Sequence, residues 1–244
     1  MPPPFHWRNG AHNTKGELQN WIQQYQTMGG GSLPVIVGLV DGRNLKFMRN
    51  GTQFLYGDHA YFQRGWDKEH FRLIRNRHHL NEVVKRPDDR MKKWGIKIEP
   101  WRQGGRDIVV IPPSTYYYDL YGVRNWTAET VAKLQTLTDR KIHVKSGKGR
   151  LRECLLEEHD AHAVVCCISV AGMEAALMGV PVFSTPDCCS WPVNAGPLEM
   201  IEKPERPERH EWACSLAYAS WHADDLEKID FRDYWYDLKE RDGH

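Results

Sequence analysis

The stretch Val164-Val-Cys-Cys-Ile-Ser-Val-Ala-Gly-Met-Glu-Ala-Ala-Leu-Met-Gly-Val-Pro-Val-Phe183 contains an apolar strand, a turn of small residues, a helix and a second apolar strand. The apolar run predicts a strand that ends at Cys167, and the periodicity predicts a helix over residues 170–178. Gly179-Val-Pro181 is a stop signal for that helix. A strand, a helix and a strand in this order predict a βαβ unit with parallel strands.

The same alternation extends to both sides of this stretch. Apolar runs predict strands over residues 107–111, 141–144, 161–167 and 180–183. Amphipathic segments predict helices over residues 127–137, 149–158, 170–178 and 207–221. Strands that alternate with helices of this length are typical of a Rossmann-like parallel sheet.

The first half of the chain is less regular. We expect a helix over residues 14–28, strands over residues 35–40 and 53–56, and loops with helical pieces over residues 64–101. The expected fold class is α/β with two facing Rossmann-like lobes, the first reduced, and a final helix that packs back on the first lobe. The expected domains are residues 1–105, residues 106–205 and a C-terminal segment, residues 206–244.

Composition excludes several classes of protein. The chain has 244 residues, of which 41% are hydrophobic, and this is enough for a substantial core. It has no apolar run of transmembrane length and no signal-like start, so we expect a cytoplasmic protein with no membrane partner. The six cysteines include two adjacent pairs and no CxxC, which favours buried free thiols. We do not expect a zinc site at His159, His162 and Cys166, because the sequence has no second ligand pair at zinc-finger spacing.

Charge is divided unevenly along the chain. Residues 1–150 contain 25 Lys+Arg and 13 Asp+Glu, a net +12, whereas residues 151–244 contain 8 and 19, a net −11. The densest basic stretch, residues 64–106, interleaves arginines and lysines with aromatic residues. Such a mixture can follow a phosphate backbone and stack on bases, so it favours a polyanionic partner such as DNA. A solvated basic surface is the alternative.

The turn before the expected helix over residues 170–178 has the features of a phosphate site. The first N–H groups of a helix lack partners within the helix and lie at the positive end of its dipole. The small residues Ser169, Ala171 and Gly172, with Val170 between them, leave room for a phosphate to approach. Glu174 is expected in the first turn, where its carboxylate can reach ribose hydroxyls. Many α/β proteins have such a turn without any ligand, and this remains the alternative.

The pattern Ser169-x-x-x-x-Glu174-Ala-x-x-x-Gly179-Val-Pro-Val182 resembles the donor-site signature of GT-B-fold glycosyltransferases. More of the chain, over roughly residues 35–225, is similar to phage-encoded glycosyltransferase-like proteins. The similar pieces are Tyr56-Gly-Asp-His-Ala-Tyr-Phe62, Phe71-Arg-x-x-Arg-Asn76, Ile111-Pro-Pro-Ser114, Leu137-Thr-Asp-Arg140 and Ile201-Glu-x-Pro-x-x-Pro-x-Arg209-x-x-Trp212, with Leu216-Ala-Tyr218 and Trp221. The second Glu and the HxxH-type elements of several GT-B families have no counterpart here, so the resemblance does not specify the sugar nucleotide.

The resemblance implies an inverting, metal-independent glycosyltransferase without a cofactor, which uses a nucleotide sugar, most often a UDP-sugar, as its donor. The turn at residues 169–172 would hold the diphosphate, and Glu174 would hold the ribose. Basic residues near the same sheet edge and on the last helix are candidates for the donor phosphates, with a solvated loop or a cap as the alternative. These residues are Lys145, Lys148, Arg150 and Arg209.

An inverting transferase needs a general base in the acceptor lobe. Asp58 is the first candidate and His59 the second, although an Asp after Gly57 is also an ordinary turn residue. The candidates for acceptor binding are Tyr61, Phe62, Arg72 and Asn76. We expect no role for His78, His79 or His143.

Three acceptors and two other functions remain open. A hydroxymethylated pyrimidine in phage DNA is the acceptor that the basic, aromatic stretch favours, whereas a protein or polysaccharide acceptor does not require that stretch. Sugar-nucleotide epimerases are the nearest enzymatic rival, and a non-enzymatic nucleotide- or nucleic-acid-binding module is the rival of another class. An Asp58 that is buried in an ion pair would favour the binding module.

Overall fold

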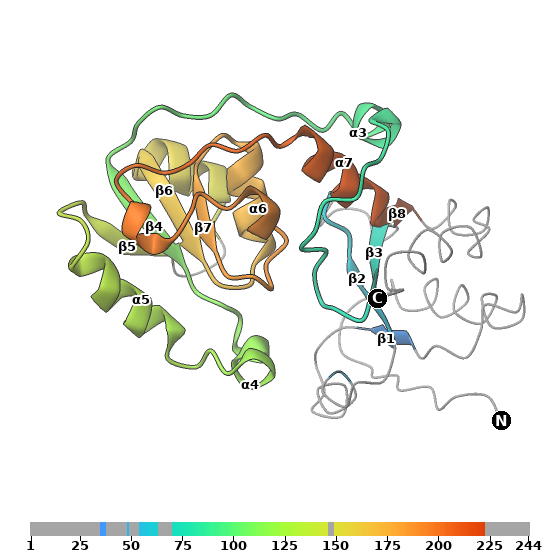
Figure 1. Ribbon diagram of the computed structural model, residues 1–244, viewed down its shortest axis with the longest axis horizontal. Coiled ribbons are helices and arrows are strands. Elements are labelled where there is room, and N and C mark those ends of the chain that lie inside the picture. Colours follow the sequence, from blue (N-terminus) through green and yellow to red (C-terminus); the bar gives the residue numbers. More distant parts are fainter. Residues whose placement is uncertain (1–34, 38–47, 49–53, 63–69, 146–148, 223–244) are drawn as a thin grey trace, which may run out of the picture. The chain divides into compact units, whose positions relative to one another are not determined.

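The computed structural model describes residues 35–37, 48, 54–62, 70–145 and 149–222 (Figure 1). The chain divides into two compact units. Unit 1 comprises Met1–His78 and Ala217–His244, and unit 2 comprises His79–Leu216. The helix expected over residues 14–28, the end of the strand expected over residues 35–40, and Lys148 lie outside the described residues.

Unit 2 is built on a parallel sheet of four strands, in the order β5-β4-β6-β7 (Figure 1). The strands are β4 (Asp107–Ile111), β5 (Ile142–Val144), β6 (Ala161–Cys166) and β7 (Val182–Ser184). All four coincide with predicted strands, and their ends differ from the prediction by at most two residues. The Rossmann-like α/β character that the sequence predicts for this part of the chain is therefore confirmed.

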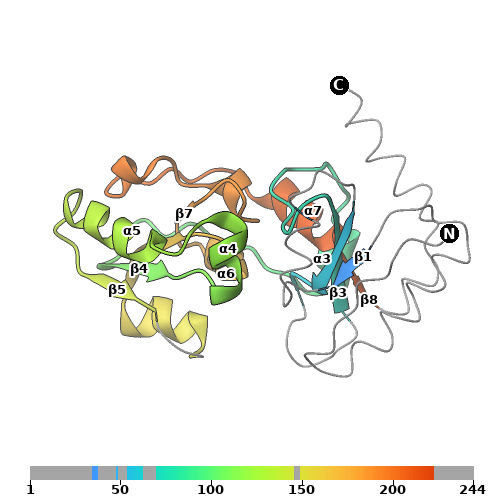
Figure 2. The ribbon, with the colours of Figure 1, turned by 90° about the horizontal axis from the view of Figure 1, so that it is seen from below.

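Helices connect these strands on both faces of the sheet. The longer connections are α5 (Trp126–Gln135), the π-helix η2 (Glu153–Glu158) and α6 (Val170–Leu177). Shorter helices are α3 (Asp89–Lys93), α4 (Tyr118–Tyr121), η1 (Thr115–Tyr117), η3 (Trp191–Val193) and η4 (Leu198–Met200). Figure 2 shows α5 and the yellow η2 on opposite sides of β4 and β5.

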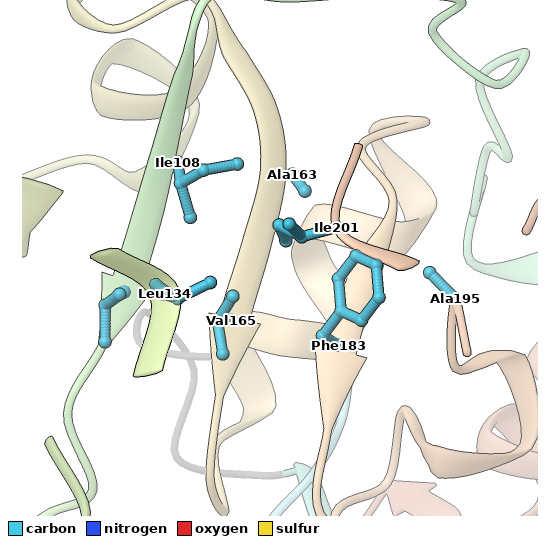
Figure 3. Close-up of a cluster of buried hydrophobic side chains, with 8 residues drawn as sticks. Ile108, Leu134, Ala163, Val165, Phe183, Ala195 and Ile201 are labelled. Atoms are coloured by element: carbon cyan, nitrogen blue, oxygen red, sulfur yellow. The ribbon is translucent and has the colours of Figure 1, made fainter. Parts of the chain in front are cut away.

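The core on the α5 face follows from the alternation of side chains along the strands. Ile108 and Val110 of β4, Val165 of β6 and Phe183 of β7 point to this face and pack against Leu134 of α5 (Figure 3). The segment after η3 covers the rest of the cluster with Ala195 and Ile201. Gly172 of α6 instead approaches Cys166, which has the opposite parity to Val165, so α6 lies on the other face.

Unit 1 contains a mixed sheet in the order β1-β2-β3-β8. Its strands are β1 (Val35–Val37), β2 (Leu55–His59), β3 (His70–Arg75) and β8 (Ser220–His222). β1 is parallel to β2, whereas β3 is antiparallel to both β2 and β8. These described strands do not by themselves form a parallel, Rossmann-like lobe.

Three segments outside the unit 2 sheet differ from the prediction. β2 ends at His59, three residues after the end of the strand expected over residues 53–56. β3 lies inside the region expected as loops and helical pieces. The charge of Arg72 is typical of a surface residue, but its side chain is 2% exposed and pairs with Asp58 of the neighbouring strand β2. The helix expected over residues 207–221 is shorter: α7 covers His210–Tyr218, and the chain then forms β8 beside β3. The apolar spacing of residues 216–221 fits a helix, but edge pairing with β3 satisfies the backbone of residues 220–222 instead.

The division between the units falls at residue 79 and not at the expected residue 106. The segment before β4 belongs to unit 2 because it packs along the turn between α6 and β7. Glu99 N donates to Leu177 O (2.8 Å), and Arg102 N donates to Gly179 O (2.8 Å).

The helices that the structure describes include none with the length and apolar character to cross a membrane.

Candidate functional site

The connections of the unit 2 sheet diverge at the carboxyl ends of β4 and β6. From the central β4 the chain goes to β5 on one side, and it then crosses to β6 on the other side. In open parallel sheets, ligands bind in the crevice that such a reversal leaves beyond the carboxyl ends of the strands. Here that place is flanked by Pro112-Pro113-Ser114 after β4 and by Cys167-Ile168-Ser169 after β6.

Ser169 begins α6 at this place, as the sequence predicts. Its backbone is extended (φ −154°, ψ 135°), and its Oγ accepts a hydrogen bond from Ala171 N (3.2 Å). The carbonyl of Ser169 also accepts from Gly172 N (3.1 Å). Two N–H groups of the first turn therefore already donate hydrogen bonds to Ser169. A phosphate at this end of the helix would replace the hydrogen bond to the Ser169 side chain.

Gly172 is required for packing in the structure. A Cβ atom at this position would lie 2.6 Å from Cys166 Sγ and 2.7 Å from Ser190 Oγ. Its small size allows α6 to approach β6 and the segment after β7 closely.

Glu174 lies deeper in the helix than the sequence predicts. α6 begins at Val170, so Glu174 is its fifth residue, and the first turn contains no acidic side chain. The predicted start of the helix was right, but its first turn ends before the fifth residue, so the expectation of Glu174 in the first turn was wrong. Glu174 is half-buried.

A cavity of about 620 Å³ opens at the carboxyl ends of β6 and β7. Two tryptophans, Trp126 and Trp191, belong to its lining, and Trp191 is 40% exposed. Ser184 Oγ, from the end of β7, is buried and has no hydrogen-bond partner among the described residues. Glu205 contributes a carboxylate, and none of the described lining residues is Lys or Arg. The cavity therefore suits an uncharged ring system with hydroxyl groups better than a phosphate.

None of the predicted site residues that the structure describes lines this cavity. Its remaining lining residues are Thr130, Val165, Cys166, Phe183, Thr185, Asn194, Gly196, Pro197 and Leu198. The signal in the sequence is the position of Ser184 and Thr185 at the end of a predicted strand, because ligands bind beyond the carboxyl ends of parallel strands.

The structure does not gather the predicted phosphate-binding cations at the start of α6. Lys145 follows β5, two strands and thus roughly 10 Å from β6, and its Nζ donates to Gly149 O (3.2 Å). Arg150 is exposed and pairs with Glu153 (3.1 Å). Lys145 and Arg150 both follow β5 at the carboxyl edge of the sheet, but neither residue lines the cavity.

Arg209 lies at the opposite end of α6 from Ser169. Its guanidinium donates to the carbonyls of Ala176 and, at 2.7 Å, Glu99, and it stacks on Trp101 with 3.7 Å between its Cζ and the ring centroid. Burial lowers the pKa of Arg209. These contacts give Arg209 a capping role, which is the alternative to phosphate binding.

Asp58, the first candidate for the general base, is held in an ion pair. Its Oδ2 accepts hydrogen bonds from Arg72 Nη2 (2.9 Å) and from the Tyr56 hydroxyl (2.8 Å). Burial by itself would raise the pKa of Asp58, but the Arg72 charge and these hydrogen bonds lower it below its usual value. A carboxylate of lowered pKa that is already paired is a weak proton acceptor.

The other predicted residues of unit 1 make structural contacts. Tyr61, Phe62 and Arg72 are buried in the core of the unit, and Arg72 Nη1 also donates to His59 O (2.9 Å). Asn76 has a positive φ of 56°, and its Oδ1 accepts from Phe54 N (2.9 Å). His59 and Asn76 are the exposed members of the set.

Breaking the Asp58–Arg72 pair is expected to destabilise unit 1. Asp58→Asn removes a carboxylate that pairs with the buried Arg72 guanidinium, which costs about 3 kcal/mol of unfolding free energy at neutral pH. Because the pKa of Asp58 is lowered on folding, its stabilisation is present above the unfolded-state pKa and is lost as the pH falls through the folded-state pKa. The difference between Asp58→Asn and wild type, measured by urea unfolding, should therefore shrink under acidic conditions.

The matched control is Asp119→Asn, since Asp119 pairs with Arg124 at 2.7 Å but both side chains are mostly exposed. That exposed pair is worth at most about 1 kcal/mol. Equal losses of unfolding free energy in Asp58→Asn and Asp119→Asn would contradict a buried ion pair at Asp58.

Comparison of the chain with protein-family models and with curated proteins found no match. The resemblance to GT-B-fold glycosyltransferases thus stands on the residues quoted above.

Proposed function

We propose that the chain is a glycosyltransferase whose unit 2 binds a nucleoside diphosphate sugar at the carboxyl edge of its parallel sheet. The observation that carries the proposal is the cavity of about 620 Å³ at the carboxyl ends of β6 and β7. It lies next to the point where the sheet connections diverge, which is the general ligand position in this class of sheet.

The lining of the cavity fits the nucleoside part of such a donor. Trp126 and Trp191 offer faces for a base, and Glu205 offers a carboxylate for the ribose hydroxyls. This assignment gives Glu205 the ribose-binding role that the sequence suggested for Glu174, because Glu205 lines the cavity. The unpaired Ser184 Oγ is a further hydrogen-bonding group for the ligand.

The diphosphate requires a different environment from the nucleoside. Because no described cation lines the cavity, we assign the diphosphate to the start of α6, where Ser169 and the helix dipole favour an anion. Lys145 and Arg150 follow β5 at the same edge and could approach a bound donor.

The ion pair of Asp58 favours a second candidate function, a nucleotide-binding module without transferase activity. Asp58 is engaged by Arg72 and Tyr56 and so does not fit the role of general base. Transfer would then need another base, and the exposed His59 is the remaining candidate in unit 1.

A transfer assay separates the two candidates. The protein is incubated with UDP-, GDP-, ADP- and dTDP-sugars and with unmodified, hydroxymethylcytosine- or hydroxymethyluracil-containing DNA, and the digested nucleosides are weighed. A sugar-sized mass gain on one modified base supports a DNA glycosyltransferase. Donor binding or donor hydrolysis without any gain directs the search to another acceptor. Donor binding with neither transfer nor hydrolysis supports the binding module, and no binding at all rejects both candidates.

Truncating Trp191 is expected to weaken donor binding. A stacked base contributes about 1–3 kcal/mol, so Trp191→Ala should weaken binding of the preferred nucleoside diphosphate roughly 5- to 150-fold by calorimetry. Trp191 is 40% exposed, so the fold should tolerate the change. Tyr116→Ala removes another exposed aromatic side chain, one that does not line the cavity, and should leave the affinity unchanged.

A further inference from the structure

A second polar cluster lies near the amino end of the unit 2 sheet. Asp107 begins β4, His143 lies in β5, and His159 follows η2. Asp107 Oδ2 is 2.8 Å from His143 Nε2 and 3.8 Å from His159 Nδ1. The amino end of β4 is roughly 13 Å from its carboxyl end, so this cluster is separate from the proposed donor site.

The alternation of the strands places these side chains on the η2 face of the sheet. Ile108 of β4 and Ile142 of β5 belong to the core on the α5 face, so their neighbours Asp107 and His143 point to the other face. His159 reaches the same face from the end of η2, and its ring stacks on that of His143 with centroids 3.9 Å apart. Three elements thus bring two imidazoles and a carboxylate together.

The cluster holds a carboxylate out of bulk water. The Asp107 side chain is only 3% exposed, and the two imidazoles are about one quarter exposed. Taking a carboxylate out of water costs several kcal/mol, and the contacts of Asp107 with Arg106 and His143 offset this cost.

The backbone that carries His159 is unusual. η2 is a π-helix, and its last hydrogen bond runs from His159 N to Cys154 O (3.2 Å). Asp160, the next residue, has a positive φ of 46°. Such π-helical turns and strained non-glycine residues are concentrated at functional sites.

From this geometry we infer a binding site for one divalent transition-metal ion, with Asp107, His143 and His159 as its protein ligands. Their ligand atoms lie within 4.8 Å of one another. Two ligands that are each about 2.0–2.1 Å from a zinc-sized ion lie roughly 3.3 Å apart at a tetrahedral angle, and the observed 2.8 and 3.8 Å bracket this value. Two imidazoles and one carboxylate select ions such as Zn²⁺, Fe²⁺ or Co²⁺ over Mg²⁺ or Ca²⁺.

The neighbouring residues support this assignment. Arg106 Nε donates to Asp107 Oδ1 (3.1 Å), so it fixes the carboxylate and leaves Oδ2 directed to the imidazoles. The three ligands line a cavity of about 700 Å³, which gives an ion an entry path and leaves room for water or a further ligand. Arg140, which also lines the cavity, pairs with Glu202 (3.0 Å), and this limits its repulsion of a cation.

Titration of the metal-free protein with Zn²⁺ and Co²⁺ tests the inference. Wild type should bind one ion per chain with a dissociation constant in about the micromolar range. Asp107→Asn, His143→Gln and His159→Gln should each weaken binding at least about tenfold. His210→Gln, which removes an exposed histidine of α7, should bind as wild type does. Binding that survives the three ligand substitutions, or no binding by wild type, would overturn the site.

The Co²⁺ spectrum of wild type keeps the test valid if a variant fails to fold. Nitrogen and oxygen ligands give d–d bands in the visible region, whereas a thiolate ligand adds an intense charge-transfer band in the near ultraviolet. A spectrum without that band supports the three ligands named here. The band itself would assign the ion to cysteines such as Cys154, which lies near His159 and Glu158, and would contradict the inference.

Discussion

Gly179→Ala is expected to destabilise unit 2 by at least about 3 kcal/mol, which corresponds to a fall in melting temperature of roughly 6–12 °C. Gly179 has a φ of +77°, and a Cβ atom there would lie 2.1 Å from Pro100 O. The added methyl group would therefore strain the backbone and also push away the segment that carries Glu99 and Arg102. That segment is joined to the turn by two backbone hydrogen bonds, Glu99 N to Leu177 O and Arg102 N to Gly179 O.

Gly122→Ala is the matched control for this prediction. Gly122 also has a positive φ, +66°, but no atom lies within 4 Å of the position of its added Cβ. Gly122→Ala should lower the free energy of unfolding only by the backbone strain, about 1 kcal/mol. Urea unfolding followed by circular dichroism measures both variants, and equal losses would contradict the close approach of Pro100 to Gly179.

Ser169→Asp is expected to weaken the binding of a nucleoside diphosphate at least about 100-fold. Asp caps a helix as well as Ser does, so α6 should remain intact. Its charge would stand where we assign the diphosphate, and two like charges about 4 Å apart repel by up to about 4 kcal/mol at the effective dielectric constant of a protein surface. Calorimetry with the nucleoside diphosphate and with the uncharged nucleoside measures the effect.

The uncharged nucleoside should bind to wild type and to Ser169→Asp with similar affinity, because it does not reach the start of α6. Ser169→Asn, a neutral cap, should retain most of the affinity for the diphosphate. Equal weakening of both ligands by Ser169→Asp would indicate a disturbed fold. Unchanged diphosphate binding would exclude the start of α6 as the phosphate position.

The sequence predicts unit 2 well because its signals are local. The strands of the parallel sheet are short apolar runs, and Ser169 and Gly179 mark the two ends of α6 as a cap and a stop signal. β3 escapes prediction because Arg72 is neutralised by Asp58, a partner on another strand. A buried arginine cannot be distinguished from an exposed one by local spacing.

The candidate sites depend on contacts that sequence spacing does not contain. Trp126, Trp191 and Glu205 come from three separate segments, and only the folded sheet brings them to one cavity. His143 was expected to have no role, because its neighbours Asp107 and His159 are far from it in the sequence. The alternation along β4 and β5, once their register is known, places Asp107 and His143 on the same face.

The proposed function requires that the cavity at the carboxyl ends of β6 and β7 is a nucleotide site. A crystal structure of the protein with a saturating nucleoside diphosphate tests this directly. We expect density for the base and ribose in the cavity between Trp126 and Trp191, with the diphosphate at Ser169. A nucleotide bound elsewhere, or no bound nucleotide at saturating concentrations of any of the common nucleoside diphosphates, would contradict the account.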